Sequence, residues 1–187
     1  SQTRIDITLP AAQLASASAG TYSETFRIDL CRFGGGGGYA QCLAPVNFTV
    51  TLPELIQITN LDDLNLGAWS GTGDIQMTED FCVFRNGQGG LAVRTDGAND
   101  AGGNFNLSGA GTIPYSIEYS QGAGFYPATP GGTINYATSG FIGESVRDCT
   151  NVGGTNMSVR ITVNEADLQS SPSGAYNDTV TIYVEPD

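Results

Sequence analysis

Residues 157–184 read MSVRITVNEADLQSSPSGAYNDTVTIYV, and residues 3–30 read TRIDITLPAAQLASASAGTYSETFRIDL. The two stretches align without a gap at an offset of 154 positions, and identical residues recur along the alignment, among them Tyr22 with Tyr176. Each copy opens with apolar residues at every second position, as a half-buried β-strand requires, and continues through a polar loop into a second strand. The sequence therefore predicts one unit of strand, loop and strand that occurs twice.

The same alternation recurs along the rest of the chain. The alternating apolar sets are Ile5, Ile7 and Leu9; Val46, Phe48, Val50 and Leu52; Ile113, Tyr115, Ile117 and Tyr119; Met157, Val159, Ile161 and Val163; and Val180, Ile182 and Val184. Turn-forming stretches such as residues 34–38, Asn86-Gly87 and residues 130–132 separate them. Many short strands without helical periodicity between them favour an all-β antiparallel sandwich. The short alanine run at residues 11–17 predicts a loop or a single helical turn.

A length of 187 residues suits one domain with a hydrophobic core. We expect a β-arm in residues 1–45 and a sandwich domain in residues 46–187. Two strands alone bury too little apolar surface to be stable in water, so the copy at residues 3–30 must pair with something. It either adds strands to the sandwich of its own chain or joins another molecule.

The charge balance excludes several classes of function. All seven basic residues are arginine, and 19 acidic residues give a net charge of -12. This charge disfavours nucleic acids and anionic membrane surfaces as partners, because both attract clustered positive charge. The chain has no histidine, the usual general base and a common metal ligand. We therefore expect no enzyme activity, no cofactor and no metal. No apolar run reaches the roughly 20 residues of a spanning helix, so we do not expect a membrane-embedded protein.

One loop carries oxygen ligands that calcium could use. Asp96, Asn99 and Asp100 lie within a few positions of one another, but their spacing is not that of an EF-hand loop. An ordinary solvated turn is the preferred interpretation.

Three stretches resemble a known family. The ending at residues 173–184, SGAYNDTVTIYV, resembles the terminal Gly-x-Tyr-x-Asp-Thr strand of spore coat protein U-like domains. Residues 61–73 are similar to the early Leu-x-Phe-Gly segment of these domains, and residues 81–93 resemble their cysteine-bearing strand and the strand after it. The family includes the pilins and tip adhesins of archaic chaperone-usher pili. The resemblance covers roughly residues 46–187.

The resemblance implies an Ig-like sandwich that lacks one strand. In this family the missing strand is supplied first by a periplasmic chaperone and then by a neighbouring subunit, with assembly at an outer-membrane usher. An incomplete sandwich exposes an apolar groove beside unpaired N–H and C=O groups, and an alternating strand satisfies both. The resemblance therefore implies a secreted structural subunit of a pilus or fimbria on the bacterial surface. Such a subunit forms a homopolymer by strand exchange.

Two segments could donate the strand. The preferred donor is residues 4–9, with Ile5, Ile7 and Leu9 facing the groove of the neighbour. A second arm strand carrying Phe26, Ile28 and Leu30 could accompany it as a two-stranded insertion. Val46–Leu52 also alternates, but packing as the first strand of its own domain is preferred for it. The alternative that residues 3–30 pair within their own chain stays open.

The four cysteines fit an oxidising compartment and can pair in three ways. Cys31 and Cys42 bracket the glycine run at residues 34–38, and Cys82 lies on the strand where the family carries a cysteine. Proximity and the family resemblance favour the pairs Cys31–Cys42 and Cys82–Cys149. This connectivity is a hypothesis.

A second function comes from a different class of protein. The chain could be a pilus tip adhesin or a carbohydrate-binding module that uses aromatic residues. The candidate aromatic residues are Trp69, Tyr115, Tyr119, Phe125, Tyr126 and Tyr136. A fibre subunit needs a donor arm and a terminal adhesin does not, so the arm favours the fibre subunit.

Overall fold

Apolar residues alternate with polar ones along the central strands, as the sequence predicts, so that one side of each strand faces a common core. In the computed structural model, which describes residues 6–26, 45–87, 89–135 and 146–186, the strand β7 (Thr112–Ser120) buries Ile113, Tyr115, Ile117 and Tyr119. The residues between them point to the other side of the sheet, because side chains alternate along a strand.

The strands form two sheets and a separate ribbon, and all pairs are antiparallel. The larger sheet has the order β11 (Tyr176–Asn177), β6 (Phe105–Gly109), β7, β10 (Met157–Val163), β4 (Ile75–Arg85) and β3 (Ile56–Thr59), with β8 (Phe125–Pro127) also paired to β7. The smaller sheet has the order β12 (Val180–Pro186), β5 (Leu91–Gly97) and β9 (Thr133–Asn135). The two sheets pack face to face as an Ig-like antiparallel sandwich, which confirms the predicted fold class.

The core joins the two sheets directly. Phe81 of β4 packs edge-on against Tyr119 of β7, with ring centroids 6.5 Å apart. The hydroxyl of Tyr119 lies 2.8 Å from the hydroxyl of Thr95 on β5, so a buried hydrogen bond crosses from one sheet to the other. Burial raises the pKa of Tyr119 to about 12. Cys82 and Cys149 form a disulfide between fully buried side chains, which is the pairing favoured for them above.

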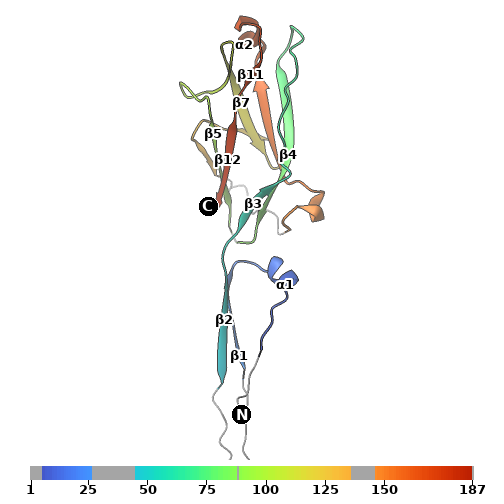
Figure 1. Ribbon diagram of the computed structural model, residues 1–187, viewed down its shortest axis with the longest axis vertical. Coiled ribbons are helices and arrows are strands. Elements are labelled where there is room, and N and C mark those ends of the chain that lie inside the picture. Colours follow the sequence, from blue (N-terminus) through green and yellow to red (C-terminus); the bar gives the residue numbers. More distant parts are fainter. Residues whose placement is uncertain (1–5, 27–44, 88, 136–145, 187) are drawn as a thin grey trace, which may run out of the picture.

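The ribbon consists of β1 (Gly20–Phe26) and β2 (Val46–Leu52), which pair from Gly20 with Leu52 to Phe26 with Val46. It projects from one end of the sandwich, beyond β3 (Figure 1). We expected Val46–Leu52 to be the first strand of the sandwich, and this interpretation is wrong, since neither sheet contains β2. The alternation requires one covered face but does not say what covers it.

Short helical segments link some strands. The alanine run contains α1 (Ala11–Ala15), a single turn as expected. We did not expect α2 (Glu165–Ser170), because six residues are too few for helical periodicity to be visible. A 3-10 turn, η2 (Thr150–Val152), follows Cys149. No helix of the described residues is both long and apolar enough to cross a membrane.

Several residues of the predicted arm lie outside the described ranges. They are Ile5, Ile28, Leu30, Cys31 and Cys42, together with the glycine run at residues 34–38. The pairing of Cys31 with Cys42 stays a prediction.

The disulfide fixes β4 to the segment that leads into β10. It closes a loop across a sequence separation of 67 residues, so it restricts the unfolded chain strongly. Replacing Cys82 and Cys149 together by alanine is expected to lower the free energy of unfolding by about 2–4 kcal/mol. Urea unfolding followed by tryptophan fluorescence measures this change. An unfolding free energy equal to that of the unmodified chain would contradict the prediction.

Candidate functional site

In the part of the chain that the structure describes, β12 has a strand partner on one side only. It pairs with β5 along its whole length, from Val180 with Gly97 to Pro186 with Leu91. Among the described residues no strand pairs with its other side. In an antiparallel ladder alternate residues point both backbone groups away from the partner. The outer side of β12 therefore presents N–H and C=O groups for a further strand.

The inward side chains of β12 are only half-buried, while those of β5 beside them are covered completely. Val93 and Thr95 of β5 are 1% and 0% exposed. Their cross-strand neighbours, Val184 and Ile182, keep part of their surface accessible. Val180, the third apolar residue that we expected on this strand, is also half-buried. The core is thus closed at β5 and open at β12.

A groove runs beside this open edge. Its cavity has a volume of ≈ 670 Å³. The segment 61–67 lines it on one side, and the residues on the other walls include Leu107, Ile117, Val159, Ile161, Val180 and Ile182. Segment 61–67 belongs to the stretch that resembles the early segment of the family, and it forms no strand.

The unequal width of the two sheets explains the groove. Strands in a sheet lie about 4.8 Å apart, so three strands cover far less width than six. The smaller sheet therefore does not reach across the whole inner face of the larger sheet, and segment 61–67, which is not a strand, lines the remaining space. Leu107 of β6 and Ile161 of β10 line the groove and are packed against the core without being fully buried. One or two further strands beside β12 would cover them.

A polar cluster fixes the start of β12. The hydroxyl of Tyr115 donates a hydrogen bond of 2.6 Å to Asp178 Oδ2, and burial together with this bond raises the pKa of Tyr115. Asp178 Oδ1 accepts hydrogen bonds from the backbone N–H and the side-chain amide of Asn99, at 3.1 and 2.9 Å. The cluster holds the turn before β12 in place while the strand itself stays open.

Similar contacts occupy the loop of Asp96, Asn99 and Asp100, whose oxygen atoms the sequence analysis considered as possible calcium ligands. Asn99 binds Asp178, Asp100 accepts a hydrogen bond of 2.7 Å from the N–H of Gly97, and Asp96 forms an ion pair with Arg94. Within the described ranges, no three acidic, cysteine or histidine side chains gather at a distance suited to a metal ion. Most polar groups of the loop thus bind other groups of the chain, while Asp100 Oδ1 is buried without a hydrogen-bond partner among the described residues.

The ribbon has two chemically distinct faces. Residues paired across an antiparallel ribbon point to the same side. One face carries the apolar residues Tyr22, Phe26, Val46, Phe48, Val50 and Leu52, interrupted by Glu24. The opposite face carries Thr21, Ser23, Thr25, Asn47, Thr49 and Thr51. The rings of Phe26 and Phe48 stack with their centroids 5.1 Å apart. Only one face of the ribbon therefore favours contact with an apolar surface.

The segment before β1 folds back over part of this apolar face. Leu9 and Leu14 line a cavity of ≈ 440 Å³ together with Tyr22, Phe48 and other residues of the ribbon. Leu9 and Leu14 remain 43% and 38% exposed, so the cover is loose. The described residues of the preferred donor, Ile7 and Leu9, belong to no strand. Their role as donor residues stays a prediction.

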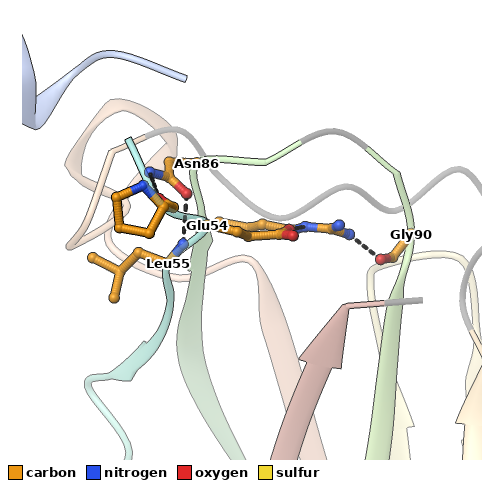
Figure 2. A network of polar contacts seen from close by, with 6 residues as sticks. Glu54, Leu55, Asn86 and Gly90 are labelled. Carbon is orange, nitrogen blue, oxygen red and sulfur yellow. Dashed lines mark hydrogen bonds and ion pairs between the residues drawn. The ribbon is translucent and has the colours of Figure 1, made fainter. Parts of the chain in front are cut away.

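A network of hydrogen bonds holds the linker between ribbon and sandwich (Figure 2). The side chain of Asn86, in the turn after β4, accepts a hydrogen bond of 2.7 Å from the N–H of Leu55 and donates one of 3.2 Å to the carbonyl of Pro53. Its backbone N–H donates to the carbonyl of Leu55 at 3.2 Å, and its carbonyl accepts from the N–H of Ala19 at 2.7 Å. Asn86 of the sandwich thus binds both the segment that leads into β1 and the segment that follows β2.

Arg85 strengthens this junction. It is 4% exposed and forms an ion pair with Glu54 of the linker and a hydrogen bond with the carbonyl of Gly90. A buried arginine requires such partners, because an unpaired charge in the protein interior is costly. We predicted only a turn at Asn86-Gly87, since the sequence does not reveal which backbone groups a turn residue will bind.

The comparisons with known proteins concern the fold. No family model matches the chain, and no curated protein does. The chain is similar to the crystal structure of CfaE, the adhesive subunit of CFA/I fimbria of enterotoxigenic Escherichia coli, with a TM-score of 0.52 and 16% identity over 90% of this chain and 53% of that chain. It is also similar to a chain in a structure of the chaperone-tip adhesin complex of CFA/I fimbriae biogenesis, with a TM-score of 0.49 and 16% identity over 91% of this chain and 53% of that chain.

The similarity to CfaE, at 16% identity, is a similarity of fold. This chain spans about half of the length of both matched chains. The predicted resemblance to spore coat protein U-like domains has no matching family model, so it stays a resemblance of motifs.

The candidate aromatic residues do not form one surface patch. Tyr115 and Tyr119 belong to the core, and Trp69 donates a hydrogen bond of 2.8 Å to the carbonyl of Gly73 in its own turn. Phe125 lies beneath the guanidinium of Arg160, 3.8 Å from its ring centroid. Tyr126 is 43% exposed, and Tyr136 lies outside the described ranges.

The junction predicts a local effect of Asn86→Ala. The N–H of Leu55 loses its acceptor, and a hydrogen bond is worth about 0.5–1.5 kcal/mol. We expect the amide of Leu55 to exchange with solvent about tenfold faster, as measured by NMR hydrogen exchange. Asn47→Ala, on the polar face of the ribbon, is the matched control and should leave this amide unchanged. An unaltered exchange rate in Asn86→Ala would mean that Asn86 does not hold the linker.

Proposed function

We propose that the chain is a structural subunit of an extracellular fibre of the pilus type, and that the groove beside β12 accepts a β-strand from another molecule. The observation that carries the proposal is the one-sided pairing of β12 above an incompletely covered core. The fold shared with CfaE, a fimbrial subunit, supports it.

Strand insertion would satisfy the backbone and the core of the acceptor together. The incoming strand pairs with the open edge of β12, and its alternate side chains enter the groove. Burying three or four large apolar side chains stabilises the complex by about 1.5–3 kcal/mol each, in addition to the backbone pairing. The inserted strand must leave the groove as a whole, so its release is slow.

The donor in this proposal is the N-terminal arm of a neighbouring subunit. Ile5, Ile7 and Leu9 are the groove-facing residues, and the strand of Phe26, Ile28 and Leu30 accompanies them. The apolar face of the ribbon supports this role, because it offers the alternation that a groove requires. Each subunit then donates to one neighbour and accepts from another, which gives a homopolymer. A periplasmic chaperone would fill the groove before assembly at an outer-membrane usher.

The subunit has no catalytic role in this proposal, and its place is the bacterial surface, reached through the periplasm. The Cys82–Cys149 disulfide supports this location, since disulfides form and persist in oxidising compartments.

A second candidate is a terminal adhesive subunit that accepts a strand and donates none. The fold of residues 6–17 beside the ribbon supports it, because Leu9 and Leu14 line one cavity with the apolar face of the ribbon of their own chain. CfaE is named as the adhesive subunit of its fimbria. The two candidates share the acceptor groove and differ in the fate of the arm.

The acceptor groove is tested by Ile182→Asp. Ile182 points into the groove, so a carboxylate there would lack a partner once a donor strand covers it. We expect this variant to remain a folded, disulfide-bonded monomer that forms no fibres, judged by electron microscopy and light scattering. Thr181→Asp is the matched control, because the neighbouring side chain points to solvent. Fibres of normal length from Ile182→Asp would contradict the acceptor role of β12.

The donor is tested by deleting residues 1–10. If these residues are the donor, the shortened chain stays folded with an unchanged melting temperature and no longer polymerises. If the chain is a terminal subunit, the deletion leaves its incorporation at the fibre end unaltered. Immunogold labelling of fibres separates these results, with label along the fibre for a homopolymer and at the end for a terminal subunit.

A further inference from the structure

The two copies of the repeat share local structure as well as sequence. At the offset of 154 positions, α1 coincides with α2. The hydroxyl of Tyr22 donates to the carbonyl of Ser18 at 2.8 Å, and the hydroxyl of Tyr176 donates to the carbonyl of Pro172 at 2.7 Å. Both bonds join a tyrosine to the fourth residue before it, at equivalent positions.

A second pair of equivalent hydrogen bonds lies at the ends of the helices. Ser16 Oγ donates to the carbonyl of Gln13 at 3.3 Å, and Ser170 Oγ donates to the carbonyl of Asp167 at 3.1 Å. The repeat therefore encodes one folded device, consisting of a helical turn and a tyrosine that binds the loop after it.

In the C-terminal copy this device closes the sandwich. The chain leaves β10, passes through α2, pairs with β6 as β11 in the same larger sheet, and then enters the smaller sheet at β12. Leu168 of α2 and Tyr176 pack against the core at this crossing. The unit that contains this device thus leads from the larger sheet to the smaller one and packs against an apolar core on the way.

The N-terminal copy has the same device without a core beside it. Leu14, the equivalent of Leu168, is 38% exposed, and Tyr22, the equivalent of Tyr176, is 47% exposed. Ile7, the equivalent of Ile161 on β10, is 47% exposed. Within the described ranges, neither sheet of the sandwich packs on these residues. The residues that contact a core in one copy are therefore uncovered in the other.

The uncovered residues continue the apolar face of the ribbon. Leu9 and Leu14 line one cavity together with Tyr22, Phe48 and Val50. A helical turn, a strand pair and a segment equivalent to β10 thus share one apolar side. A two-stranded ribbon is marginally stable alone, so this side needs a cover.

We propose that residues 6–26, with β2 as the partner strand of β1, are the closing part of a second β-sandwich of the same design as the first. The partner is a body with strands equivalent to β4, β5, β6 and β7 and with an apolar core that lacks its closing strands. We place this body in the same polypeptide, because in the C-terminal copy the body and the closing strands belong to one chain in this order. The proposal does not rest on the acceptor groove. An arm used in this way cannot be donated, so this proposal replaces the donor role of the arm and leaves a chain that accepts a strand at β12 and donates none.

A fused chain tests the proposal. A second copy of residues 53–156, the strands of the sandwich before its closing unit, is placed directly before Thr3 of the intact chain. We expect the amides of β1 and β2 to exchange at least about a hundredfold more slowly than in the intact chain, as for strands beside a packed core. The same fusion with Leu14→Asp and Tyr22→Asp is the matched control and should lose this protection.

A reciprocal graft provides a second test that does not require the duplicated body to pack well against the arm. Residues 3–30 replace residues 157–184 in the otherwise intact chain, at the offset of the repeat. A grafted chain that unfolds cooperatively and forms the Cys82–Cys149 disulfide supports the proposal even if the fused body folds poorly. If the graft is unfolded and the fusion leaves β1 and β2 unprotected, the proposal is wrong. It is also wrong if the intact chain forms a dimer in which both strands become protected.

Discussion

The structure depends on one constraint, that within the described residues β12 has strand partners on one side only. A strand in the middle of a sheet satisfies both rows of its backbone groups, and an edge strand satisfies one. Here the edge coincides with an opening in the core, because the smaller sheet is too narrow to cover the larger one. Val180, Ile182 and Val184 are half-buried for this reason. The molecule therefore combines a stable core at β5 with an incomplete one at β12.

The rest of the chain is arranged around this opening and around a second apolar surface on the ribbon. The disulfide and the Thr95–Tyr119 hydrogen bond stabilise the closed part of the core, so the open part can remain without a cover. Arg85 and Asn86 bind the linker, which gives the ribbon a defined direction relative to the sandwich. Both surfaces are suited to other β-strands, since each combines apolar residues with a strand edge. A strand accepted at β12 and a second sandwich packed on the ribbon would each cover an exposed apolar surface, whereas donation of the arm and its packing in a second sandwich exclude each other.

The sequence predicted the parts of the fold that depend on period and repetition. Alternation identified β7, β10 and β12 together with their buried sides. The repeat identified a helical turn and a tyrosine contact that both copies share, but the described residues around Ile7, expected to form a strand like β10, form none. The position of β2 was wrong, because alternation around Phe48 indicates one apolar face but not its partner. The helix α2 is too short to leave a periodic signal. The role of Asn86 depends on backbone groups of residues 53–55 that approach it only in the folded chain. The groove was expected from a family resemblance, since a strand that is missing leaves no pattern of its own.

Hydrogen exchange of the β12 amides, compared between the isolated chain and the assembled fibre, tests the central claim most directly. In the isolated chain, the amides of β12 that point away from β5 should exchange much faster than those that point toward it. In the fibre, both sets should exchange slowly, because an inserted strand pairs with the open side. Uniformly slow exchange along β12 in the isolated chain would contradict the account, since it would mean that this edge is already paired.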